Sequence, residues 1–169
     1  MLHDVITRSD LPEALEIKAL RSDILDAFAD LECLIYSFLK DSKIVSKAPH
    51  LGARLEAFKT IDGISRIAKA NYTKRDRLAD DISALLPIRA DIVHSRIKTC
   101  VIDGASAARF VNSQNACVDY PPNRILMADE LREICYRIKC IVAELGTLGR
   151  VTSPAPSLPP PSPAAAGGP

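Results

Sequence analysis

Apolar side chains recur at three- and four-residue steps over the first quarter of the chain, between Ile17 and Phe38. This spacing places them on one face of an α-helix and leaves most charged side chains on the opposite face. Asp10 stands where a helix N-cap is expected. Pro12 falls in the first turn, where its missing N–H costs no hydrogen bond. We therefore expect a long amphipathic helix over residues 11–40.

Three further stretches show the same helical period. The pattern predicts a short helix around residues 51–60 and a longer one over residues 73–97, with Pro87 inside it. A last helix carries an apolar stripe over residues 131–145. Gly146 follows that stripe directly, and glycine commonly ends helices.

The segment before the last helix is expected to be less regular. Asp103-Gly104 separates two short apolar runs, which is typical of a tight β-hairpin, and Pro121-Pro122 favours an extended link. The sequence therefore predicts an all-α fold, a helical bundle with an irregular or short hairpin excursion before its last helix.

The C-terminal segment differs in composition from the rest. Residues 151–169 carry no charged side chain and are rich in proline, serine and alanine. Such a segment buries too little apolar surface to offset its ordering entropy, so we expect a disordered tail. The run Pro159-Pro160-Pro161 is either part of a spacer or a ligand for a proline-binding module. The chain is thus divided into one helical domain, residues 1–150, and a tail, residues 151–169.

Composition excludes several classes of protein. The chain has 169 residues, of which 47% are hydrophobic, and a formal net charge of +1. No stretch approaches the ~20 apolar residues of a membrane span, and the first residues lack an apolar signal core, so we expect a cytoplasmic protein without membrane contact. Its five cysteines lack Cys-x-x-Cys spacing and there are only three histidines, so no metal site is expected. The cysteines, Cys33 and Cys135 among them, are interpreted as reduced core residues. The glycines are scattered singly, which gives no support for nucleotide binding, and no cofactor is expected.

Charge is unevenly distributed along the chain. Residues 1–41 carry 4 basic and 9 acidic side chains, whereas residues 42–98 carry 12 basic and 6 acidic ones. One interpretation is a basic surface for a phosphate-rich partner. The other is that the two segments attract each other, within a monomer or across a dimer. The pattern alone leaves both open.

One group of residues in the basic segment suggests chemistry. On a helical wheel the apolar stripe formed by Ile82, Leu85 and Ile92 has Arg89 near its centre. A guanidinium on an apolar stripe is costly unless an anion or an interface compensates it. His94 is three residues from Asp91, so the carboxylate can orient the imidazole. Arginine binds phosphate bidentately and histidine transfers protons near neutral pH, which together suit metal-free cleavage of RNA.

Arg89-x4-His94 at the end of an apolar helix resembles the Arg-x4–6-His motif of the HEPN superfamily. The resemblance implies an all-α fold, a homodimer formed through the motif helices, and RNA cleavage without metal, usually by a toxin or an antiviral effector. It assigns phosphate binding to Arg89 and catalysis to His94. The family usually has Asn, Asp or His directly after the arginine, where this chain has Ala90. The nucleotidyltransferase-paired branch has tyrosine two residues after the histidine, where this chain has Arg96.

Two functions follow as hypotheses. The first is a metal-independent endoribonuclease of HEPN type, a homodimer in which Arg89 and His94 of both protomers, with Asp91, line a basic cleft. The second is a non-catalytic HEPN-like regulatory or protein-interaction module, which Ala90 favours. An antitoxin or another partner protein is a candidate partner in addition to RNA. The basic residues expected to contact RNA are Arg75 and Arg77, near Tyr72, and Arg96 and Lys98.

Overall fold

The computed structural model of the chain describes residues 12–44, 50–62, 67–111 and 123–149. These residues form five α-helices, a short 3₁₀ helix and a three-stranded antiparallel sheet that precedes the last helix. The elements are α1 (Pro12–Asp41), α2 (Leu51–Lys59), η2 (Lys69–Asn71), α3 (Tyr72–Ser83), α4 (Leu86–His94), β1 (Arg96–Ile102), β2 (Ala105–Val111), β3 (Asn123–Met127) and α5 (Ala128–Leu145). The expected cap at Asp10, the Pro121-Pro122 link and the tail lie outside the described residues.

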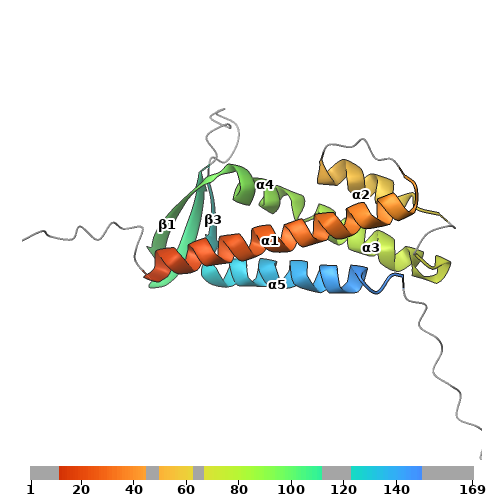
Figure 1. The fold of residues 1–169 in the computed structure, drawn as a ribbon. Helices are drawn as coiled ribbons and strands as arrows, with labels where there is room; N and C mark the ends of the chain where they lie inside the picture. Colours follow the sequence, from red (N-terminus) through yellow and green to blue (C-terminus); the bar gives the residue numbers. More distant parts are fainter. Residues whose placement is uncertain (1–11, 45–49, 63–66, 112–122, 150–169) are drawn as a thin grey trace, which may run out of the picture.

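Helix α1 is the longest element and contacts most of the others. It runs the length of the molecule with α5 beside it, with the sheet at one end and α2 and α3 at the other (Figure 1). Its apolar stripe is buried as expected, with Ile17, Ile24, Leu31 and Ile35 fully enclosed. The predicted first, second and last helices are confirmed, and Gly146 is the C-cap of α5.

The single helix expected over residues 73–97 is wrong. Helix α3 ends at Ser83, and α4 begins at Leu86 with Pro87 in its first turn. Proline has no N–H, and its ring would clash with the carbonyl of Ser83, four residues earlier, so it kinks or breaks a helix, and here the helix breaks. After His94 the chain enters β1, so Arg96 and Lys98 lie on a strand and not on the helix.

The predicted fold is confirmed in part: the described chain is mostly helical, but the excursion before the last helix is a three-stranded antiparallel sheet. The hairpin at Asp103-Gly104 is confirmed and is longer than expected, because β1 and β2 pair over their full length. Both turn residues have positive φ, 50° and 81°, as a type I′ turn requires. The third strand, β3, pairs with β2 and was not predicted.

The core contains the apolar stripe that the helical wheel places around Arg89. Ile82, Leu85 and Ile92 are at most 2% exposed in this chain and pack with α1 side chains. Cys135 is also buried, as expected, whereas Cys33 is exposed on α1 and the core interpretation was wrong for it. Among the described helices, none has the length and apolar character needed to cross a membrane.

The turn that joins β1 and β2 gives a stability prediction. An alanine in place of Gly104 would have to adopt φ +81°, although no atom lies within 4 Å of the position of its Cβ. We expect Gly104→Ala to lower the free energy of unfolding by about 1 kcal/mol, the cost of the left-handed conformation. Gly146→Ala is the matched control, because Gly146 has φ −60° and should be neutral or slightly stabilised by alanine. Urea unfolding of both variants measures the difference, and equal stabilities would contradict the strained-turn account.

Candidate functional site

Arg89, the expected phosphate-binding residue, is paired with α1. Its Nη2 lies 2.5 Å from Oε1 of Glu32, and its guanidinium lies 6.0 Å from the centre of the Phe28 ring. The Arg89 and Glu32 side chains are 29% and 25% exposed. Glu32 also lies 3.8 Å from Arg54. Glu32 of the acidic first segment thus pairs with Arg54 and Arg89 of the basic second segment within one chain, an attraction of the kind that one of the two interpretations expected.

A second arginine connects α1 to the end of α4. Nε and Nη2 of Arg21 donate hydrogen bonds of 3.1 and 2.8 Å to the carbonyl oxygen of Ile92. The last carbonyls of a helix have no partner within the helix, so a guanidinium there satisfies one of them and interacts well with the helix dipole. Arg21 therefore fixes where α4 ends and where β1 begins.

Asp91 and His94 are not joined in the way the spacing suggested. The Asp91 carboxylate lies 2.8 Å from Nε of Arg124, on β3. His94 is exposed, and within the described ranges no hydrogen bond reaches its imidazole. Successive residues of an α-helix are rotated by about 100°, so the side chains of Arg89 and His94, five residues apart, point about 140° away from each other. Arg89 therefore faces α1 while His94 faces solvent. Within one protomer, α4 therefore does not bring the Arg89 and His94 side chains together.

Arg75 and Arg77, the two residues of α3 that were predicted to contact RNA, bind other groups of the same chain. Arg75 is 6% exposed and donates from Nη1 to the carbonyl oxygen of Ile61 at 2.5 Å. Its guanidinium also lies 4.6 Å from the centre of the Tyr72 ring. Arg77 is more exposed, but its Nη2 lies 2.5 Å from the carboxylate of Glu144. These contacts neither exclude nor support RNA binding, which stays a prediction for Arg75 and Arg77.

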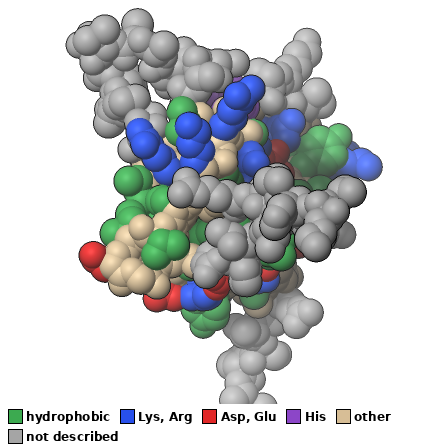
Figure 2. All heavy atoms as spheres, turned by 90° about the vertical axis from the view of Figure 1, so that its left-hand side faces the viewer, with side chains coloured by type: hydrophobic (Ala, Val, Ile, Leu, Met, Phe, Trp, Pro, Cys, Tyr) green, Lys and Arg blue, Asp and Glu red, His purple; other side chains and the backbone are tan. Residues whose placement is uncertain are grey.

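The other two predicted RNA contacts lie on one face of the sheet, together with a cation that the sequence reasoning missed. Arg96 and Lys98 are two residues apart on β1, so they share a face, and Lys98 is directly opposite Arg109 on β2. All three side chains are exposed. Figure 2, which looks at the sheet end of the molecule, shows lysine and arginine side chains gathered on its upper part. We call Arg96, Lys98 and Arg109 the basic sheet face.

This arrangement follows from the alternation of the strands. The opposite face of the sheet carries Ala108, Phe110 and Leu126, which are at most 8% exposed and belong to the core. Because successive strand residues point to opposite faces, the register that buries Phe110 exposes Arg109. The two-residue loop fixes the same register, so Arg109 was predictable from Asp103-Gly104.

The basic sheet face is not neutralised by the described part of the chain. Neither Arg96, Lys98 nor Arg109 forms an ion pair with a described carboxylate, in contrast to Arg89 and Arg77. Like charges that face each other directly across strands destabilise a sheet. The arrangement is therefore suited to an anionic partner. No cluster of metal-ligating side chains is found in the described ranges.

The Arg89–Glu32 ion pair gives a second stability prediction. Glu32→Gln should lower the free energy of unfolding by about 1–2 kcal/mol, less than a fully buried pair because both side chains are about a quarter exposed. Glu16→Gln removes a partner of Arg132 from an ion pair that is more exposed than Arg89–Glu32, and it is the control, expected to cost about 0.5 kcal/mol or less. Chemical denaturation measures both variants. If Glu32→Gln is as stable as the wild type, Arg89 is not held by this pair.

Comparison with known proteins adds no relative to this picture. No protein-family model, no curated protein and no solved structure matches the chain. The resemblance to the HEPN superfamily therefore rests on the residues around Arg89 and His94, and it stays a prediction.

Proposed function

We propose that the protein binds the phosphate backbone of single-stranded RNA on its basic sheet face. The observation that carries this proposal is the direct opposition of Lys98 and Arg109, with Arg96 beside them and no described carboxylate to compensate them. A phosphate that binds between the two strands relieves this repulsion and releases counterions, which is the main source of affinity for nucleic acids.

The remaining side chains of that face indicate the mode of binding. Its described members beside the three cations are alanine, cysteine, methionine and aliphatic residues, with Ile125 47% exposed, and aromatic residues are absent among them. Recognition of single strands by stacking uses aromatic side chains. Binding here is therefore expected to follow the backbone charge and to show little preference for base sequence.

A binding measurement tests this proposal. Replacing Arg96, Lys98 and Arg109 together with glutamine should weaken binding of a fluorescein-labelled oligouridylate by at least about tenfold in anisotropy titrations. The slope of log K against log salt should fall by about 2, because each lost contact with a single strand removes about 0.7. The control is a triple glutamine variant at Lys40, Lys69 and Lys139, which are exposed on other elements and remove the same charge.

Two results would contradict the proposal. One is equal loss of affinity in both triple variants, which would mean that net charge alone matters. The other is a wild-type protein that does not bind RNA in low salt but does bind an acidic peptide, which would make the basic sheet face a protein-interaction surface.

RNA cleavage is the second candidate, and one observation favours it. His94 ends α4 with an exposed imidazole, two residues before Arg96 begins the basic strand, so RNA bound to the sheet would pass near it. In this reaction the imidazole takes the proton of the 2′-hydroxyl, and the 2′-oxygen then attacks phosphorus. The bond to the 5′-oxygen breaks, and that oxygen takes a proton from the imidazolium of a second protomer.

RNA cleavage by this mechanism requires an arginine that contacts the phosphate and a dimer interface that brings in a second His94. Arg89 must exchange Glu32 for phosphate, or Arg96 must stabilise the charge on the phosphate in its place. A homodimer through the Arg89–His94 helix would use the outer face of α4, where Pro87, Ala90 and His94 are exposed at helical spacing. The apolar stripe of the same helix cannot serve, since it is buried in the core.

The cleavage hypothesis predicts the behaviour of three variants. His94→Ala should reduce the cleavage rate by about 10²–10⁴-fold while RNA affinity is retained. His50→Ala is the control: His50 caps α2 through Nδ1, so its loss should affect stability but not cleavage. Arg89→Lys should recover little activity if Arg89 reaches the phosphate. Wild-type activity should survive EDTA and leave 2′,3′-cyclic phosphate ends on gel analysis. If the wild type binds RNA without cutting it, cleavage is excluded and RNA binding stands.

A further inference from the structure

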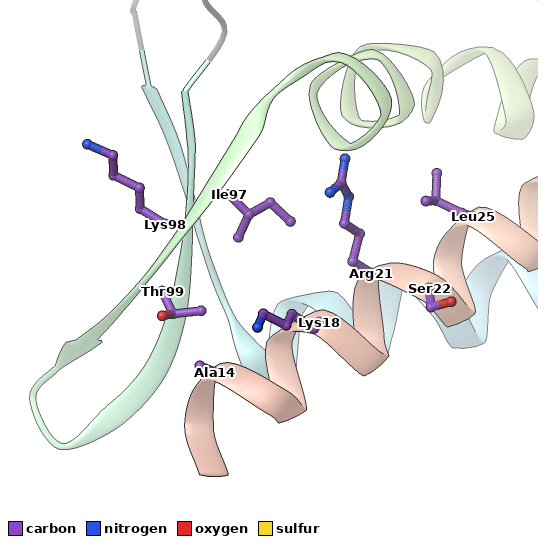
Figure 3. A pocket seen from close by; sticks show the side chains of 8 residues that line it. All are labelled: Ala14, Lys18, Arg21, Ser22, Leu25, Ile97, Lys98 and Thr99. Atoms are coloured by element: carbon purple, nitrogen blue, oxygen red, sulfur yellow. The ribbon is translucent and has the colours of Figure 1, made fainter. Parts of the chain in front are cut away.

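A pocket of about 610 Å³ lies between the first half of α1 and the edge strand β1. In Figure 3, Ile97 and Thr99 extend from β1 into the space above α1, and Lys18, Ser22 and Leu25 lie along the helix below it. A cavity of this size is within the range of small-molecule sites. It adjoins the basic sheet face, since Lys98 also lines it, but Ile97 and Thr99 belong to the other side of β1 because alternate strand residues point to opposite sides.

A half-buried guanidinium forms the polar end of this pocket. Arg21 rises from α1 toward the end of α4, where Nε and Nη2 donate to the Ile92 carbonyl oxygen (Figure 3). The two hydrogen bonds hold its orientation, and no carboxylate among the described residues pairs with its charge. Nη1 accordingly has its donors available. A cation that is partly removed from water and already oriented binds an anion with a small entropic cost.

The chemistry of the lining selects the kind of ligand. The described lining consists of basic, hydroxyl and aliphatic residues, and carboxylate, amide and imidazole groups are absent from it. A ligand rich in hydrogen-bond donors, such as a sugar, would find only hydroxyl acceptors there. An organic cation would meet Lys18 and Arg21. Aromatic residues, which would stack on a nucleobase, are also absent from the lining.

We propose that this pocket binds a small carboxylate with an aliphatic body. The carboxylate would accept from Arg21 Nη1 and from the Lys18 ammonium, and Ser22 and Thr99 would donate from their hydroxyls. The aliphatic body would cover Leu25 and Ile97, which are half-buried and already pack against the core. Lys98 points away from α1 in Figure 3 and contributes only its positive potential. This proposal goes beyond RNA binding and does not rest on it.

Isothermal titration calorimetry of the full chain tests this proposal with three probes. Octanoate should bind at one site. Acetate, which lacks the aliphatic body, and octanamide, which lacks the charge, should each bind at least about tenfold more weakly, since a charge-assisted hydrogen bond contributes more than one factor of ten. Equal affinity for octanoate and octanamide would overturn the assignment of an anion site, and no heat with octanoate up to its solubility would overturn the proposal as a whole.

Matched variants locate the site. Ser22→Phe places a large side chain in the pocket from an exposed helix position and should abolish octanoate binding. Ala29→Phe is the control, because Ala29 is exposed on the same helix but does not line the pocket. Lys18→Gln should weaken binding about tenfold, whereas Lys40→Gln should not. Thermal unfolding verifies that each variant is folded. If Ser22→Phe, with an unchanged melting temperature, binds octanoate like the wild type, octanoate binds elsewhere and the proposal is wrong.

Discussion

The structure around the candidate sites depends on how α1 holds α4. Helix α4 has nine residues, too few for a helix that is stable in isolation, and it begins at a proline that separates it from α3. Its stability comes from Ile92 in the core and from two arginine contacts, Arg89 with Glu32 and Arg21 with the Ile92 carbonyl. Because both contacts reach α1, they set the end of α4 and the start of β1. The positions of His94, of the basic sheet face and of the pocket beside Arg21 follow from this.

The same contacts divide the arginines into two groups with different roles. Arg89 and Arg75 lie at buried or half-buried positions and bind a carboxylate or a carbonyl of the chain itself. A charge removed from water must have such a partner, so these residues are committed to the fold unless a ligand replaces the partner. Arg96 and Arg109 are exposed and have no described partner, so an external anion meets no competitor there. The proposed RNA contacts are therefore on the strands, although the motif that first indicated RNA lies on the helix.

Local patterns predicted the local structure well. The apolar period located α1 and α5, and Asp103-Gly104 located the β-hairpin, because each of these signals depends only on neighbouring residues. A kink or break between α3 and α4 was also readable, since the ring of Pro87 would clash with the carbonyl of Ser83 in a regular helix. Strand β3 was missed because its five residues adjoin the last helix and their pairing with β2 is a tertiary contact.

The candidate site was less predictable from the sequence, because its partners, like those of β3, are brought together by tertiary contacts. The spacing of Arg89 and His94 can be read from the sequence, but Glu32, which binds Arg89, lies 57 residues away. Arg124, which binds Asp91, belongs to the strand that was missed. Partners of this kind decide whether a charge is available to a ligand, and only the packed fold reveals them. Arg109 is the exception, because the hairpin register alone places it opposite Lys98.

The central claim is that the free cations of the strands, and not Arg89, meet the phosphate backbone. A nuclear magnetic resonance titration of ¹⁵N-labelled protein with oligouridylate tests it directly, because it reports backbone amides and arginine Nε–H groups in one experiment without any substitution. The account predicts that the largest shifts occur in β1 and β2 around Lys98 and Arg109, while the Nε–H signal of Arg89 stays unchanged. Shifts centred on α4, with a change at Arg89 and none on the strands, would contradict it.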